Sequence, residues 1–249
     1  MRAANSLLAN TAPTWFTVEK TGHDFLVGRA RLPKTPWAKG GLKLRIEGSS
    51  TPRVREEVPG TDLPTRCPER HIQGDQTFCL GLRLLAVQSD DLAGQWWRQL
   101  EQYLRCQGAA ELTKVWPPGQ ALDHGEAGKH HERALGLAVR AGVDEEYALA
   151  RLGERSWLTD RAIKLFDNKG RPINGHAPCP RGCQRRARGR LVPKLRKNCS
   201  RRATLVSLAF AELQRRKALD DYWQHVCGCG DKCCRTMRGC PLAAHEDSK

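Results

Sequence analysis

The sequence of 249 residues lacks a long hydrophobic run. Its most apolar stretch, Phe78 to Val87, contains Arg83 and is far shorter than the roughly 20 residues that a membrane-spanning helix needs. The first ten residues, MRAANSLLAN, form no apolar signal segment, so we expect a cytoplasmic chain with no membrane partner. Internal repeats and low-complexity tracts are lacking too, which excludes a repeat architecture.

Acidic residues are nearly missing from one part of the chain. Between residues 169 and 217, Glu212 is the one acid against 15 Lys and Arg, so this segment carries +14 of the net charge of +15. The composition of 39% hydrophobic and 28% charged residues nevertheless suits a globular chain and excludes disorder throughout.

The cysteines divide the chain in the same way as the charge. Eight of the 11 lie between Cys179 and Cys240. We therefore predict two units: an α+β domain over residues 1–167 and a basic, cysteine-rich module over residues 168–249. The joint is expected at residues 167–172, where Gly and Pro favour turns.

Hydrophobic periodicity predicts strands first and helices second. Strands are expected over residues 15–19, 25–32 and 42–46, with an irregular fourth near 54–58 and a Pro-rich stretch to 68 that cannot be a central strand. Helical spacing follows over 92–104, 126–140, 144–154 and 203–225, with Ser89 as a cap before the first helix. Trp96 and Trp97 are adjacent, so one of them is expected to point off the apolar face. This order favours an α+β fold over a doubly wound sheet.

A lone cysteine with a nearby histidine and amide marks the candidate active site. The segment places His71, Gln73, the Gly74-Asp75 turn and then Cys79 close together in sequence. Such a set can supply a nucleophilic thiol and a donor for an oxyanion. The alternative is that Cys79, between Phe and Leu, is an ordinary core thiol. Cys67 and Cys106 are interpreted as structural or incidental.

These residues resemble the active-site flap of the ubiquitin-conjugating enzymes. That family carries His-Pro-Asn, a Gly-containing turn and a Cys-Leu pair; this chain has His71-Ile72-Gln73, Gly74-Asp75 and Phe78-Cys79-Leu80. The closer likeness, over roughly residues 15 to 140, is to divergent bacterial members that sit beside a ubiquitin-like protein, an activating enzyme and a JAB-type peptidase. Trp116-Pro117 and His124-Gly125 match a later feature of some of these members.

The resemblance implies a UBC-like antiparallel meander sheet with flanking helices. It also implies that Cys79 accepts a ubiquitin-like protein from an activating-like enzyme as a thioester and passes it to an amine. His71 would then shape the flap, and Gln73 would stand where the family has its oxyanion-stabilising Asn. The group that deprotonates the amine stays open among Asp75, Asp123 and His124, with His124 ranked first.

The C-terminal cysteines predict structural zinc, with two ions for eight thiols. Their short spacings across Gly-bearing turns let several thiolates converge on one ion, and the expected reducing setting disfavours disulfides. Disulfides and an iron–sulfur cluster are the alternatives, and His176, His225 or His245 could replace a cysteine. The pairing is open among the predicted ligands, which are Cys179, Cys183, Cys199, Cys227, Cys229, Cys233, Cys234 and Cys240.

The basic run within this module predicts an acidic protein or nucleic acid as a further partner. Few aromatic residues accompany the run, so stacking on bases is weakly supported. A zinc-dependent binding module on a non-catalytic scaffold is therefore the alternative to the conjugating enzyme.

Overall fold

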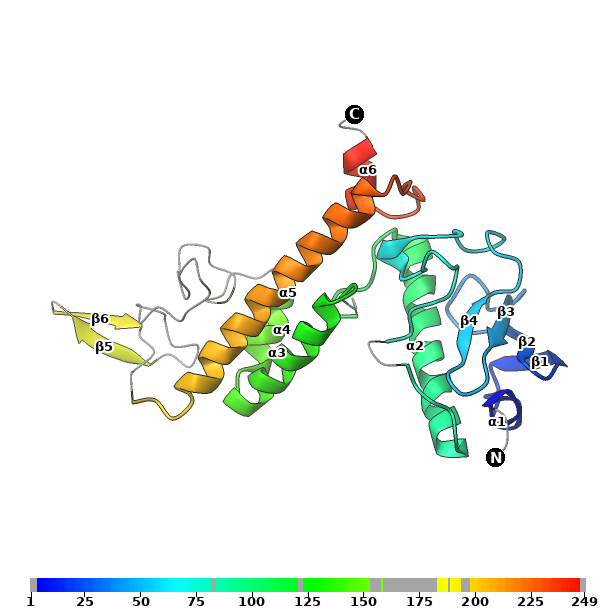
Figure 1. The fold of residues 1–249 in the computed structure, drawn as a ribbon, viewed down its shortest axis with the longest axis horizontal. Helices are drawn as coiled ribbons and strands as arrows, with labels where there is room; N and C mark the ends of the chain where they lie inside the picture. The colour runs from blue at the N-terminus through cyan, green and yellow to red at the C-terminus, as the bar shows by residue number, and fades with distance from the viewer. Residues whose placement is uncertain are drawn as a thin grey trace. The chain divides into compact units, whose positions relative to one another are not determined.

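The computed structural model describes residues 4–81, 84–120, 123–152, 158, 183–187, 189–193 and 198–246. The chain forms two compact units, which are described separately (Figure 1). The first comprises residues 1–122 together with 226–249, and the second comprises residues 123–225. The predicted joint at 167–172 lies outside the described residues.

A four-stranded antiparallel meander forms the sheet of the first unit, in the order β1-β2-β3-β4. Its strands are β1 (Phe16–Thr21), β2 (Phe25–Ala30), β3 (Leu42–Glu47) and β4 (Arg53–Glu56). In β3 the apolar side chains alternate with charged ones, and only the apolar ones are fully buried. This period of two turns one face of the sheet to the core. The strand predictions are thereby confirmed.

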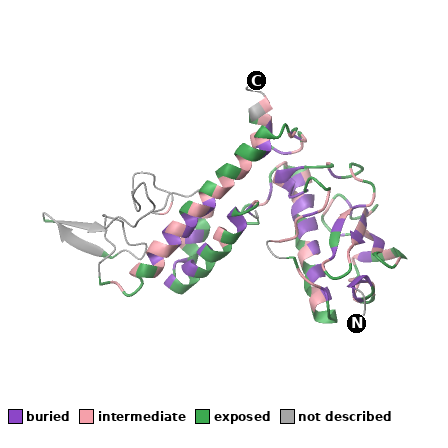
Figure 2. Ribbon diagram, viewed as in Figure 1, coloured by how far each residue is buried: buried purple, intermediate pink, exposed green. Residues whose placement is uncertain are grey.

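Helix α2 (Asp90–Thr113) packs its tryptophans against this sheet. The ring of Trp97 lies 4.7 Å from that of Phe16 on β1, and the Trp96 indole donates to the carbonyl of Pro52. Figure 2 shows buried residues all along the helix. Ser89 caps its first turn by accepting from the amide of Leu92, as predicted.

The expectation that one tryptophan points off the apolar face is wrong. Trp96 and Trp97 are both buried. Besides the sheet, α1 (Ala4–Asn10) also packs against Trp97. The sequence pattern did not predict this short helix. The Trp97 indole donates to the carbonyl of Leu8 in this helix, so α1 shields the side of α2 that would otherwise face water.

Helices α3 (Ala127–Ala141), α4 (Asp144–Arg151) and α5 (Arg202–Gly228) build the second unit, although the last residues of α5 belong to the first. Small and aliphatic side chains of α3 and α5 form one core cluster with Tyr147 of α4. The second unit also holds a hairpin of β5 (Gln184–Ala187) and β6 (Arg190–Pro193). The three helices lie close to their predicted ranges.

The segment after α5 ends in α6 (Pro241–Glu246) and belongs to the first unit. Among the described residues, no helix is long and apolar enough to cross a membrane. A four-stranded antiparallel sheet followed by helices makes the fold α+β, as predicted.

Candidate active site

A narrow hairpin of backbone hydrogen bonds carries the predicted flap residues. The amide of Gln73 donates to the carbonyl of Thr77 at 2.9 Å, and the amide of Cys79 donates to the carbonyl of His71 at 2.9 Å. At its base, the amide of Phe78 donates to the carbonyl of Val54 on β4. The edge of the sheet therefore fixes the hairpin, which holds the backbones of residues 73 and 79 on opposite arms of one turn.

His71 shapes this hairpin through its backbone and its ring. It follows the short helix η1 (Pro68–Arg70) in the left-handed region, with φ of 55°. Its ring packs edge-on against Trp116, with 4.9 Å between centroids, and it is buried. Tyr103 on α2 donates its hydroxyl to the carbonyl of Arg70 at 3.1 Å. The turn that precedes Cys79 is thus fixed from both sides.

The Cys79 side chain is half-buried and lies between two surface hollows. One hollow has a volume of about 250 Å³ and is lined by Gln73, Phe78 and Trp96 among others. The other measures about 390 Å³ and is lined by Tyr103 and Trp116 among others. Cys79 therefore lines the surface and is not sealed in the core, as the core-thiol alternative would require.

Burial raises the pKa of Cys79 above its ordinary value, while the Gly81 backbone and the Gln73 side chain oppose this effect by hydrogen bonding. Gln73 lines the same hollow as Cys79, so its amide lies on the same surface as the sulfur, at the position where the resemblance places the family's Asn. An amide N–H that donates to sulfur stabilises the thiolate more than the thiol, because charge strengthens the bond. At neutral pH the resting side chain is the thiol.

The raised pKa predicts a pH profile for alkylation. Only the thiolate attacks iodoacetamide, so the rate constant at Cys79 should keep rising from pH 7 to pH 9 without a plateau. Gln73→Ala should slow alkylation at pH 8, because it removes a donor to the thiolate. Mass spectrometry of the Cys79 peptide measures the rates, and Gln95→Ala on the larger hollow is the matched control. A plateau near pH 7 would contradict this description of the sulfur.

The predicted candidates for a general base have other contacts. Asp75 accepts from the Thr77 amide and hydroxyl and pairs with Arg53, so it holds the turn of the hairpin. Asp123 and His124 belong to the second unit. Asp123 pairs there with Arg215 at 2.6 Å.

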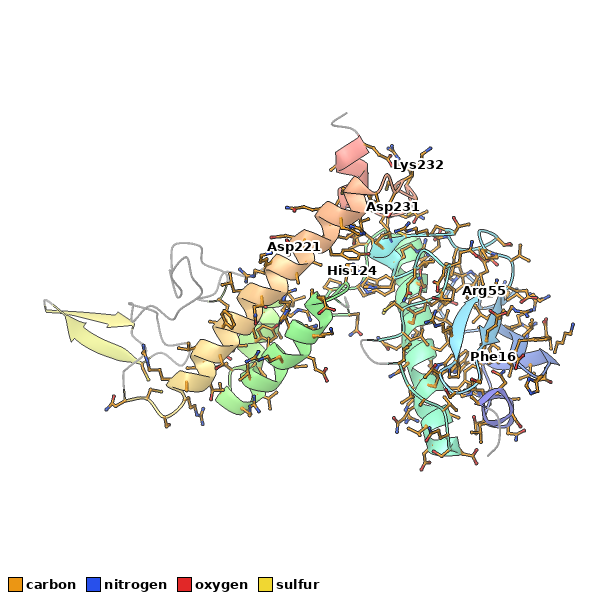
Figure 3. The ribbon with its side chains drawn as sticks, in the orientation of Figure 1. Phe16, Arg55, His124, Asp221, Asp231 and Lys232 are labelled. Carbon is orange, nitrogen blue, oxygen red and sulfur yellow. The ribbon has the colours of Figure 1, made fainter. Side chains whose placement is uncertain are left out.

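The His124 imidazole stacks on the Tyr222 ring at 4.7 Å (labelled in Figure 3). Burial lowers its pKa to about 4, against the opposing charge of Asp123. A neutral imidazole at pH 7 is compatible with the predicted role of a base, but its ring is held within the second unit's own aromatic cluster.

The predicted metal ligands are distributed over both units. Cys179 lies outside the described residues, and Cys183 and Cys199 belong to the second unit. Cys227 is in the last turn of α5, and Cys229, Cys233, Cys234 and Cys240 follow in the first unit. The described cysteines form no disulfide. Within the described ranges, no group of three or more His, Cys, Asp or Glu side chains is placed to hold a metal ion.

One contact between cysteines was not predicted. The sulfur of Cys67, just before η1, lies 3.0 Å from the sulfur of Cys234. The two residues are 167 positions apart, so no sequence spacing could reveal the pair. The coupling raises the pKa of the buried Cys67 thiol and lowers that of Cys234, because one proton shared between the sulfurs favours a thiol beside a thiolate.

Comparison with known proteins covers most of the chain in two parts. Residues 15–118 match the family model described as a prokaryotic E2 domain, E2 being the ubiquitin-conjugating class. Residues 123–242 match the model described as a cysteine-rich domain, C-terminal to E2 domain. No curated protein and no solved structure matches the chain. The two matches support a bacterial E2-like protein with a cysteine-rich module, whose broad functional class is ubiquitin-like conjugation.

Proposed function

We propose that this chain accepts a ubiquitin-like protein on Cys79 as a thioester and transfers it to an amine. The observation that carries the proposal is the position of Cys79, which is half-buried, lines two hollows and shares one of them with Gln73. The match of residues 15–118 to a prokaryotic E2 domain supports it, and so does the order of meander, flap hairpin and α2, which suits a UBC-like fold.

The first step is an exchange of thioesters. The Cys79 sulfur attacks the carbonyl carbon of a modifier held as a thioester on an activating-like enzyme. A new carbon–sulfur bond forms at Cys79, and the thiol of the activating enzyme leaves with the proton. Because burial raises the pKa of Cys79, its thiolate is scarce in the resting protein and reacts with an activated ester brought to it.

The second step is aminolysis. The amine nitrogen attacks the same carbonyl carbon, an amide bond forms, the bond to Cys79 breaks, and the sulfur leaves as a thiol with the proton that the amine loses. Negative charge collects on the carbonyl oxygen during this step. The Gln73 amide, which lines the same hollow as Cys79, would donate to that oxygen. His71 contributes by fixing the hairpin rather than by touching the substrate.

The proposal is tested by incubating the full chain with its activating-like enzyme, its ubiquitin-like protein and ATP. The expected product is a covalent adduct that thiol reductant cleaves. Cys79→Ala should abolish the adduct, whereas Cys106→Ala, which changes a buried cysteine of α2, should leave it. Gln73→Ala should still form the adduct but discharge it to an amine roughly 10²-fold more slowly. An adduct that persists in Cys79→Ala would exclude this sulfur as the acceptor.

An acidic partner for the basic run stays a prediction. Within the described residues, part of that charge is already paired: Arg215 and Arg216 bind Glu212, and Lys217 binds Asp221. Arg201 donates to the carbonyl of Ala141 at the end of α3.

A further inference from the structure

The loop before the flap hairpin contacts the segment between α5 and α6 through two cysteines. The sulfur of Cys67 lies 3.0 Å from the sulfur of Cys234. One residue before Cys67, Arg66 forms an ion pair with Asp231, which Figure 3 labels. All four residues belong to the first unit. A charge pair therefore holds the two segments together on one side of the sulfurs.

A second polar contact joins the same segments on the other side of the sulfurs. The Arg70 guanidinium donates to the Thr236 hydroxyl at 3.4 Å, and that hydroxyl lies 3.1 Å from the Cys234 sulfur. Arg70 is buried and also donates to Gln107 and Glu111 of α2, so its position is fixed. The distance between the two sulfurs is therefore set by the fold on both sides and not by one flexible side chain.

The two sulfurs differ in their access to solvent. Cys67 is fully buried, and its amide and carbonyl pair with those of Ile72. Cys234 is half-buried and precedes the exposed Arg235. Redox-sensitive cysteines have this arrangement, in which an accessible sulfur lies next to a second cysteine that can displace the oxidised group. A small oxidant in water would reach Cys234 first and would leave Cys67 as the displacing thiol.

We propose that Cys67 and Cys234 are a redox pair that hydrogen peroxide converts into a disulfide. The Cys234 sulfur attacks one peroxide oxygen, the O–O bond breaks, and hydroxide leaves as water with the thiol proton, so that Cys234 becomes a sulfenic acid. The Cys67 sulfur then attacks the Cys234 sulfur. An S–S bond forms, the S–O bond breaks, and a second water leaves with the Cys67 proton. The two thiols supply both electrons that reduce one peroxide to two waters.

The reaction requires little movement. A disulfide bond is about 2.05 Å long, so the two sulfurs would approach by about 1 Å from their present 3.0 Å. In the structure both cysteines are free, which is the reduced form of the pair. Disulfides that form in a reducing compartment are usually transient, so a thiol reductant should restore both thiols.

The disulfide would act on the flap through its backbone. Cys67 forms a β-bridge with Ile72, and the Cys79 amide donates to the carbonyl of His71 at 2.9 Å. A covalent bond from Cys67 to the C-terminal segment therefore limits the opening of the chain that leads to Cys79. The redox pair itself does not depend on thioester transfer at Cys79.

The test is peptide mapping of the full chain by mass spectrometry, without reductant, before and after treatment with hydrogen peroxide. A linked pair of peptides that contain Cys67 and Cys234 should appear with peroxide and disappear with dithiothreitol. The same linked pair should form in Cys79→Ala, so failure of the redox pair and failure of the thioester proposal are distinguishable. Cys106→Ser, which changes another buried cysteine of the first unit, should form it too.

The same map contains the results that would overturn the proposal. These are the absence of the linked peptides after peroxide, and a link from Cys234 to Cys233 or Cys240 in place of Cys67. Cys234 is also one of the zinc ligands predicted from the sequence. A metal that shields Cys234 from peroxide until a chelator removes it would likewise overturn the proposal.

Two further readouts follow the separate steps. In Cys67→Ser, peroxide should leave Cys234 as a sulfenic acid that dimedone traps, with no linked peptide, and circular dichroism checks that this variant folds. In the oxidised wild-type chain, hydrogen exchange of the Ile72 and Cys79 amides should slow by roughly 10-fold or more, because the disulfide restricts opening of the flap base. Exchange that is unchanged by oxidation would contradict the effect on the flap.

Discussion

Arg70→Met is expected to lower the free energy of unfolding of the first unit by about 1–3 kcal/mol, the usual cost of leaving a buried acceptor without its donor. The Arg70 guanidinium has no exposed surface. It donates to Gln107 at 2.7 Å and to Glu111 at 2.8 Å, both on α2. Methionine would fill most of the volume but leave the buried Gln107 oxygen without its donor, whereas Glu111 would keep its pair with Lys114. Since His71 is the next residue, the loss should also loosen the flap.

The pH dependence of this effect follows from Glu111. Burial raises the pKa of Glu111, but hydrogen bonds from Arg70 and Lys114 outweigh it and hold the pKa below its ordinary 4.5. A carboxyl with a lowered folded-state pKa stabilises the fold above its unfolded pKa and loses this contribution as the pH falls through the folded value. The difference between wild type and Arg70→Met should therefore shrink below about pH 4.

Hydrogen exchange of the β2 and β3 amides in urea measures the stability of this unit separately from the other. Arg105→Met is the matched control, because Arg105 pairs with Glu101 on the exposed side of the same helix. That change should cost no more than about 0.5 kcal/mol. Equal effects of Arg70→Met and Arg105→Met would show that the buried network does not stabilise the fold.

Arg215→Met should destabilise the second unit by more, about 3–5 kcal/mol, because both of its carboxylate partners are buried. Arg215 lies between two buried carboxylates. It donates to Glu212 at 2.7 and 2.9 Å and to Asp123 at 2.6 Å. The Tyr147 hydroxyl also donates to Glu212, so the network joins α4 to α5. Without the guanidinium, the pKa values of both carboxyls should rise, and the variant should be least stable at neutral pH and above.

Hydrogen exchange of the α5 amides measures this second effect. Lys217→Met provides the control, since Lys217 and Asp221 form an exposed pair on the same helix. The control should change stability by less than about 1 kcal/mol. Loss of protection confined to α5 and its neighbours, with the sheet of the first unit unchanged, is the expected pattern. A variant as stable as wild type would contradict the assigned role of Arg215.

Local patterns in the sequence predicted most of the regular structure. The alternation of Leu42, Leu44 and Ile46 placed β3, and Ser89 placed the start of α2. Both signals act over a few residues, so tertiary contacts did not override them. Helix α1 was not predicted because its stability depends on tertiary contacts. Seven residues are too few for a stable isolated helix, and α1 is held by its contact with Trp97 of α2.

In the candidate site too, the sequence indicated the residue types but not the tertiary contacts between them. The residue types in the flap pointed to Cys79 and Gln73, but their position on one hollow depends on the hairpin that follows the left-handed His71. The number of cysteines indicated a metal site. The contact between Cys67 and Cys234 could not be predicted, because the two residues are 167 positions apart and lie in regions of different composition. Only a fold can bring such residues together.

The most direct measurement for the central claim is to trap the acyl group on residue 79. With the cognate activating-like enzyme, ubiquitin-like protein and ATP, Cys79→Ser should form an ester that survives thiol reductant and is cleaved by mild base. Mass spectrometry of the digested protein should place the modifier's C-terminus on position 79 alone. A modifier attached at another residue, or no ester in the variant and no thiol-sensitive adduct in the wild type, would contradict the account.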